Sequence, residues 1–249
     1  MRFLLTTLYI IAHGLCLAED LPGNQKKTGT LTVQQAAELV EKANAIYDQY
    51  QYSRYTLDLD WLTSIDGDVA RELSYYKGEC ITLDGLTSIN EDVARGLAKF
   101  KGNLRLDGLT SIDKGVAQEF GKSKARSLSL DGLTSIDKEV AQELAKHKGR
   151  LFLSGLTSTD KGVAQELAKY EGINLTLGLT SLDKEVAREL AETKGGLTFG
   201  GLTSIDKEVA QELAKSKGGL SLYRLTSIDK DVLKILKENP GSMLPTKSY

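Results

Sequence analysis

The sequence has few of the residues from which most disulfides, metal sites and catalytic centres are built. Its 249 residues contain two cysteines, two histidines and three prolines. Beyond residue 18 only Cys80 and His147 remain of the first two types, so neither an intramolecular disulfide nor a Cys/His metal site is expected there. A glycine-rich phosphate loop is also missing. The sequence therefore predicts a protein that is not an enzyme, with no catalytic residue, no metal ligand and no cofactor.

Cys80 and His147 themselves have structural interpretations. Cys80 stands next to Ile81 at the start of an apolar alternation, which predicts a packing residue at the edge of a strand, with a reactive thiol as the alternative. His147 follows an amphipathic pattern and is predicted to lie on the solvent side of a helix end.

The sequence also lacks a large excess of positive or negative charge. The formal net charge is −2 and the sequence pI is about 5.8. Nucleic-acid-binding proteins normally carry a basic face, so no nucleic-acid partner is expected. The 41% hydrophobic and 27% charged residues are ordinary for a soluble protein.

The first 18 residues differ from the rest. Arg2 is followed by an apolar run from Phe3 to Ala12, and a small residue stands at Ala18. This pattern predicts a signal peptide over residues 1–18, and the run is short for a membrane span. A retained anchor is the alternative. With cleavage, the protein is secreted or lies in the cell envelope (periplasmic), without a membrane span.

The rest of the chain is dominated by an internal repeat. The tripeptide Leu-Thr-Ser recurs at intervals of 23 or 24 residues, which is typical of a solenoid. The eight copies begin at Leu62, Leu86, Leu109, Leu133, Leu156, Leu179, Leu202 and Leu225.

Each repeat predicts a short strand, a turn and a helix. In the fourth copy Leu128 and Leu130 alternate as on a half-buried strand, and an Asp-Gly turn follows. A helix is then predicted from Asp137 to about Lys148, ended by Gly149 in the left-handed conformation. On this helix the small Ala141 faces inward against the next helix, and Glu143 faces water.

The segment before the repeats has its own pattern. Residues 19–54 are predicted as a disordered lead followed by a capping helix, which starts at the capping box Thr32–Gln35. Aromatic residues crowd this end of the chain, and core or cap packing is the favoured explanation, with an aromatic binding patch as the alternative. These residues are Tyr47, Tyr50, Tyr52, Tyr55, Trp61, Tyr75 and Tyr76.

The stretch "LSLDGLTSI" followed by a helix resembles the leucine-rich repeat over residues 55–238. The resemblance implies an α/β fold: a right-handed β–α solenoid over residues 55–241, with eight repeats, a parallel sheet and a tail at 242–249. It also implies protein–protein recognition. The family's asparagine ladder is not carried over, because Leu133 and its counterparts take that place; Thr134 and Ser135 are expected to cap the corner instead.

Strands stack more closely than helices, so the helices should lie on the convex side and the strands on the concave side. Arg105 and Phe152 are the possible anchors on that concave face. Just after the strands comes a row of four acids, Asp60, Asp84, Asp107 and Asp131. The row has two interpretations: Asp-Gly turn chemistry, or a site for a cation or a basic partner. Since one row offers few calcium ligands, a basic partner is favoured among ligands.

The sequence thus predicts an exported, non-enzymatic repeat scaffold that binds a protein or peptide, possibly basic, through its strand-lined concave face. The alternative is a structural or self-associating envelope protein without a dedicated ligand site. The oligomeric state stays open.

Overall fold

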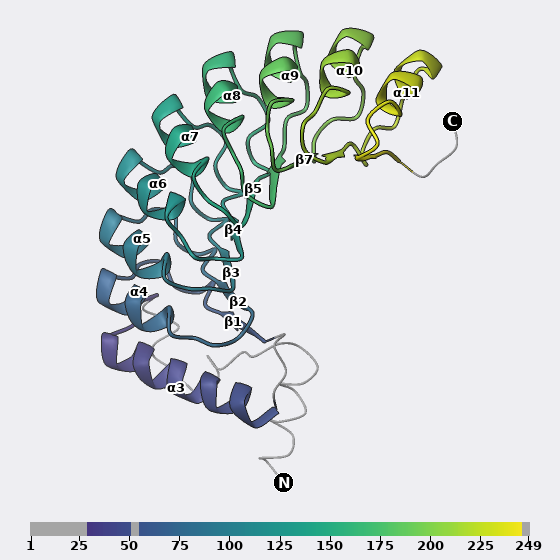
Figure 1. Cartoon of the computed structure of the whole chain (residues 1–249). Helices are drawn as coiled ribbons and strands as arrows, with labels where there is room; N and C mark the ends of the chain where they lie inside the picture. Colours follow the sequence, from purple (N-terminus) through teal and green to yellow (C-terminus); the bar gives the residue numbers. More distant parts are fainter. Residues whose placement is uncertain (1–28, 51–54, 246–249) are drawn as a thin grey trace.

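The structure is a computed structural model that describes residues 29–50 and 55–245. The predicted signal peptide, the lead up to residue 28 and Tyr52 lie outside the described residues. The described chain forms an open arc with helices on its convex side and strands on its concave side (Figure 1). All strands belong to one parallel sheet in which each strand pairs with the next along the chain. The predicted α/β solenoid is confirmed.

The strands are short and regularly spaced. They are β1 (Thr56–Asp58), β2 (Cys80–Thr82), β3 (Asn103–Arg105), β4 (Ser127–Ser129), β5 (Arg150–Leu153), β6 (Asn174–Leu177), β7 (Gly196–Phe199), β8 (Leu220–Ser221) and β9 (Ser242–Met243). β9 extends the sheet past residue 241, where the repeat pattern ends.

Among the described residues, one helix precedes the repeats and one follows the corner of each repeat. They are α3 (Val33–Tyr50), α4 (Gly67–Leu73), α5 (Glu91–Leu97), α6 (Lys114–Gly121), α7 (Lys138–Leu144), α8 (Lys161–Leu167), α9 (Lys184–Leu190), α10 (Lys207–Leu213) and α11 (Lys230–Leu236).

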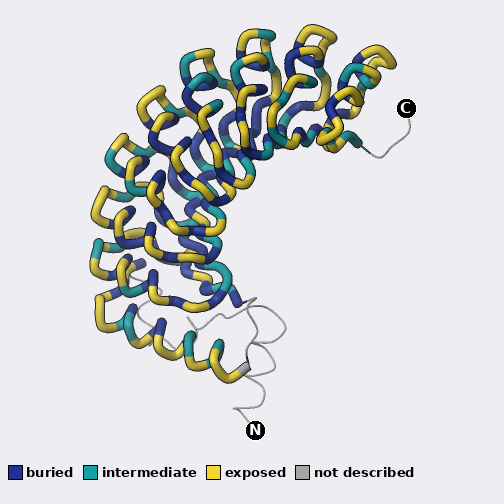
Figure 2. Tube along the Cα trace, viewed as in Figure 1, coloured by how far each residue is buried: buried dark blue, intermediate teal, exposed yellow. Residues whose placement is uncertain are grey.

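The core lies between the sheet and the helices, where Figure 2 shows a continuous buried layer. In the fourth repeat Leu128, Leu130 and Leu133 are fully buried, as the alternation and the corner motif predict. Ala141 and the alanines at the same place in the other six of the first seven repeats are also fully buried, which lets neighbouring helices pack closely. These are the rows that repeat from unit to unit, so the core is continuous along the arc.

The helices start as predicted but end earlier. The side chain at each of the eight predicted caps accepts a hydrogen bond from a backbone N–H two or three residues later, at 2.7–3.0 Å. α7 ends at Leu144 rather than near Lys148. The next N–H groups, of Lys146 and His147, bond three residues back, to Glu143 and Leu144, which tightens the last turn.

The prediction of a left-handed Gly149 is wrong, because among the described residues only Gly29 has a positive-φ glycine conformation. Gly149 is needed for space. A Cβ there would lie 2.5 Å from the carbonyl oxygen of Ala125, 2.6 Å from that of Arg126 and 2.7 Å from Nε2 of His147. The preceding repeat and the His147 ring therefore exclude any side chain at this position.

The predicted exposure of His147 is also wrong: its side chain is fully buried. The early end of α7 takes residues 146–150 off the helical period, and they alternate between exposed and buried. The ring points inward over Gly149, and Phe100 stands over Gly102 in the same way. Glu143, predicted to face water, is instead 7% exposed, and Lys146 forms an ion pair with it at 2.5 Å.

The N-terminal capping helix is confirmed as α3, which packs against α4. Its capping box forms as predicted: Thr32 N–H donates to Oε1 of Gln35 at 2.8 Å, and Gln35 N–H donates to Oγ1 of Thr32 at 3.3 Å. None of the helices in residues 29–50 and 55–245 is long and apolar enough to cross a membrane.

Candidate functional site

The concave face is lined by one side chain from each strand. The strand register aligns Asp58, Thr82, Arg105, Ser129 and Phe152 in one row, as the alternation predicts. The row continues through Thr176, Thr198, Ser221 and Met243. Arg105 is exposed and Phe152 is half-buried, so both predicted anchors lie on this face.

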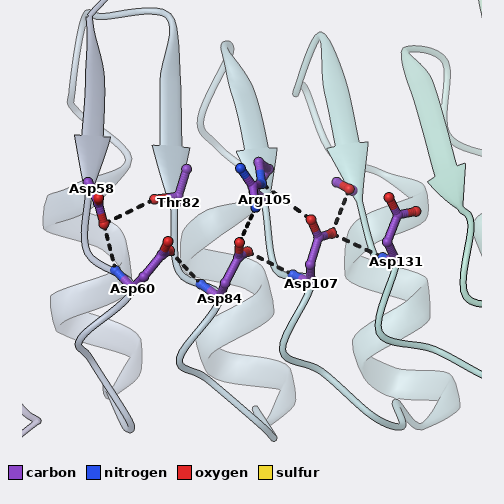
Figure 3. Close-up of polar contacts among 8 residues, drawn as sticks. Asp58, Asp60, Thr82, Asp84, Arg105, Asp107 and Asp131 are labelled. Carbon is purple, nitrogen blue, oxygen red and sulfur yellow. Dashed lines mark hydrogen bonds and ion pairs between the residues drawn. The ribbon is translucent and has the colours of Figure 1, made fainter. Parts of the chain in front are cut away.

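The four acids form a hydrogen-bonded ladder along one edge of the sheet (Figure 3). Each carboxylate accepts the backbone N–H of the corresponding residue in the next repeat. Oδ1 of Asp60 accepts from Asp84 at 2.9 Å, and Oδ1 of Asp84 accepts from Asp107 at 3.0 Å. Oδ1 of Asp107 accepts from Asp131 at 3.0 Å, and Oδ1 of Asp131 accepts from Ser154 at 2.6 Å.

This acid ladder has a structural role that an isolated Asp-Gly turn would not have. It satisfies backbone donors at the edge of the sheet, where unpaired buried donors are costly. It therefore does what an asparagine ladder would do, two positions before the corner leucine. The corner threonines contribute as expected at some repeats: the Thr180 and Thr226 hydroxyls donate to the carbonyls of Thr157 and Thr203 at 3.4 and 3.3 Å.

Arg105 places one positive charge within the acid ladder (Figure 3). Its guanidinium forms ion pairs with Asp84 and, from Nε at 3.2 Å, with Oδ2 of Asp107. Asp58 lies on the same face and accepts from the hydroxyl of Thr82 at 3.5 Å. The five carboxylates of this face are thus countered locally by one cation, and Oδ2 of Asp60 and of Asp131 bonds no described residue.

Partial burial is the main cause that raises the pKa of Asp84. The N–H of Asp107 and the charge of Arg105 oppose this effect, and the charges of Asp60 and Asp107 add to it. A carboxylate with this environment gains more from a nearby cation than an isolated one in water does. The acidic half of the concave face is therefore electrostatically suited to a positive partner.

The acid ladder stops at the fifth repeat. Ser154 takes the acid's place, and in the sixth repeat Gly178 follows the strand directly, because one turn residue is missing. The strand keeps its register, with Leu177 opposite Leu153, so the missing residue changes only the turn. Beyond this point the concave row consists of the small polar residues Thr176, Thr198 and Ser221 and ends at the exposed Met243.

The aromatic residues near the N-terminal end divide into two groups. Tyr55 and Tyr76 are buried, and the Tyr76 hydroxyl donates to the carbonyl of Tyr55 at 3.1 Å, which fits the packing explanation. Tyr75 is 58% exposed and lines a groove of about 680 Å³ with Tyr47 and basic side chains. An aromatic surface therefore exists, formed by α3 and the loop after α4 rather than by the concave face.

A basic surface runs along the opposite edge of the sheet from the acid ladder, and the sequence reasoning missed it. The loops that lead from α5, α6 and α7 into the next strand carry basic residues and no acid. We call this surface the basic edge; it comprises Lys99, Lys101, Lys122, Lys124, Arg126, Lys146, Lys148 and Arg150. The sequence signal is the alternation "KSKAR" at 122–126 and "KHKGR" at 146–150, which a net charge near zero conceals.

The remaining candidates offer little chemistry. Cys80 is a free, half-buried thiol whose pKa is raised, mainly by burial, so it is a poor nucleophile. Within residues 29–50 and 55–245, no group of three or more His, Cys, Asp or Glu side chains could hold a metal ion. The acid ladder and the basic edge are the surfaces that geometry singles out.

Comparison with known proteins adds no family. No protein-family model matches the chain, and no curated protein matches it. The repeated β–α units and their parallel sheet are the structural basis for a functional proposal.

Proposed function

We propose that this protein is an exported, non-enzymatic scaffold of the leucine-rich-repeat kind, which binds a basic protein or peptide through the acidic half of its concave face. The observation that supports it most directly is the acid ladder with its single countercharge, Arg105. Like charges one strand apart, at about 4.8 Å, repel by roughly 1 kcal/mol per pair in water before salt screening. A cationic partner would relieve this repulsion.

The geometry favours an extended partner. The acid ladder offers one carboxylate per repeat, so a chain with lysine or arginine at intervals could engage several carboxylates at once. The free Oδ2 atoms at the two ends, on Asp60 and Asp131, leave room for further hydrogen bonds without breaking the ladder. Charge-assisted bonds of this type are stronger than neutral ones.

The ladder allows binding and folding to be separated by mutation. Asparagine keeps the Oδ1 acceptor and removes the charge, so replacing all four acids with Asn should preserve the backbone bonds. Immobilised wild-type protein and this Asn variant would be used to capture proteins from an envelope extract. Partners that bind the wild type and are lost with the Asn variant support the proposal.

The matched control removes four acidic charges elsewhere. Glu139, Glu185 and Glu208 are exposed on the helices and are changed to Gln, and the exposed Asp231 is changed to Asn. This control variant should capture the same partners as the wild type. Equal capture by the Asn variant, or equal loss with the control, would refute a role for the acid ladder in binding.

A second candidate function is self-association at the C-terminal end. Here the concave row is small and polar, the sheet ends in the two-residue strand β9, and Tyr223 and Met243 are 53% and 66% exposed. Sedimentation at rising concentration tests it. Dimers that disappear with Met243→Lys would favour this function, and a monomer at all concentrations would exclude it.

A further inference from the structure

The basic edge is built so that its charges point outward together. In each of its loops exposed and buried residues alternate, so Lys122, Lys124 and Arg126 face solvent while Ser123 and Ala125 face the core. The fourth repeat has the same alternation, with His147 and Gly149 inside. Every basic side chain of the edge is therefore available on one surface.

Backbone hydrogen bonds hold these loops side by side. Lys124 N–H donates to the carbonyl of Ala98 at 2.9 Å, Arg126 N–H to that of Gly102 at 2.9 Å, and Arg150 N–H to that of Arg126 at 2.9 Å. The spacing of the positive charges from one repeat to the next is thus set by the solenoid, and little ordering would be needed on binding.

Half of the basic edge is not neutralised. Lys122, Arg126, Lys146 and Lys148 lie within 2.5–3.8 Å of acids on α6, α7 or neighbouring loops. The side chains of Lys99, Lys101, Lys124 and Arg150 form no ion pair with any described residue. Basic residues are often found in the last turn of a helix, where they interact favourably with the helix dipole. Lys99, Lys101, Lys124 and Arg150 stand beyond that turn, so the dipole alone does not explain why they are basic.

The groove of about 680 Å³ forms the N-terminal end of this edge, where Lys99, Lys101 and Arg126 lie beside the exposed Tyr75. One acid, Glu79, also lines the groove and pairs with Arg126. It is open rather than enclosed, so it suits a polymer that continues along the edge. The flat apolar face of a tyrosine ring suits the C–H face of a sugar ring, and lysines suit carboxylate or sulfate groups. Clusters of this Lys/Arg density are typical of surfaces that bind acidic glycans or nucleic acids.

We propose that the basic edge binds a linear acidic glycan, a chain of sugars that carry carboxylate or sulfate groups. The glycan would lie across the loops of three successive repeats, with Tyr75 against a sugar ring at one end. The preference for a glycan over a nucleic acid rests on the export proposed above. The site itself is independent of the acid ladder, which lies on the other edge of the sheet.

The test compares the full chain with two variants of equal charge. The edge variant carries Lys99→Gln, Lys101→Gln, Lys124→Gln and Arg150→Gln. The control variant carries Lys161→Gln, Lys184→Gln, Lys207→Gln and Lys230→Gln, at the starts of four helices. Equilibrium binding is measured to heparin for sulfate, to polygalacturonate for carboxylate, and to neutral dextran, duplex DNA and polyglutamate.

We expect the wild type and the control variant to bind heparin or polygalacturonate at low salt, and the edge variant to bind at least about tenfold more weakly. Which of the two glycans binds more tightly identifies the acidic group. No binding to either glycan, equal loss with the control, or tighter binding to DNA or polyglutamate would overturn the proposal.

Hydrogen exchange on the wild type gives a readout that does not depend on any variant folding. Bound glycan should slow exchange in residues 99–102, 122–126 and 146–150 and leave the acid ladder unchanged. Slowing confined to other loops would place the site elsewhere. The Asn variant of the acid ladder keeps the basic edge, so it should still bind the glycan. Loss of glycan binding in the edge variant therefore tests this proposal alone, and loss of protein partners in the Asn variant tests the proposed function alone.

Discussion

His147→Phe should make the protein less sensitive to acid. The His147 side chain is fully buried, and neither ring nitrogen makes a hydrogen bond of normal geometry, although backbone groups of Phe120 and Arg150 lie near the ring. Phe100 occupies the same place in the second repeat, so an apolar ring is compatible with this position. The substitution therefore removes a titratable group and keeps the shape.

Burial lowers the pKa of His147 from 6.5 to about 4. Because the folded pKa lies below the unfolded value, the folded state is fully favoured above about pH 6.5 and loses stability as the pH falls towards 4. One pKa unit corresponds to about 1.4 kcal/mol, so the imidazole costs up to roughly 3 kcal/mol at the acid end of this window.

Urea unfolding of both proteins, followed by circular dichroism between about pH 7 and pH 4, measures this contribution. Carboxylate protonation affects both proteins alike, so the difference between them isolates His147. The wild type should lose more stability than the variant by up to about 3 kcal/mol. Parallel curves would mean that the ring is solvated, and that the early end of α7 is misplaced.

Substitutions at three further positions test the packing and the acid ladder. Asp107→Ala should lower the unfolding free energy by about 1–3 kcal/mol, because the N–H of Asp131 loses its acceptor, whereas Asp107→Asn should lower it clearly less. Equal effects of the two variants in urea unfolding would show that the ladder has no structural role. Gly149→Ala should destabilise by more than about 1 kcal/mol, since its Cβ would lie 2.5 Å from the Ala125 carbonyl oxygen; an unchanged melting temperature contradicts that contact. Ala141→Leu should cost about 1–3 kcal/mol by overpacking a fully buried site, and unchanged thermal stability would show that the small row is not tightly packed.

The strands, corners and helix starts could be predicted because the same sequence pattern recurs in each of the eight repeats. The alternation of Leu128 and Leu130 sets which face of the strand is buried, and the fixed period aligns that face with the next repeat. The eight cap residues mark the helix starts independently. A strand or helix assignment that is ambiguous in one repeat is resolved by comparing all eight repeats.

The segment after each helix could not be predicted in the same way. Its conformation depends on the preceding repeat, whose carbonyls crowd Gly149 and receive the loop's N–H groups. A helical period continued past Leu144 therefore places His147 wrongly, on the solvent side. The alternation of basic and small residues in the same loop was the available signal for an inward ring.

The acid ladder shows a similar limit of local reasoning. The sequence around Asp107 fits either a turn residue or a ligand, because its partner in the ladder lies 24 residues further along the chain, at Asp131. Only the stacking of repeats reveals that a carboxylate oxygen bridges successive units. The countercharge of Arg105 on two of these acids also depends on that stacking.

The affinity of a captured partner, measured at low and at high salt, tests the role of the acid ladder most directly. The wild type should bind at least about tenfold more tightly than the Asn variant of Asp60, Asp84, Asp107 and Asp131 at low salt, and this advantage should shrink as salt screens the charges. Equal affinity of the two proteins at low salt, with both folded, would contradict binding through these carboxylates.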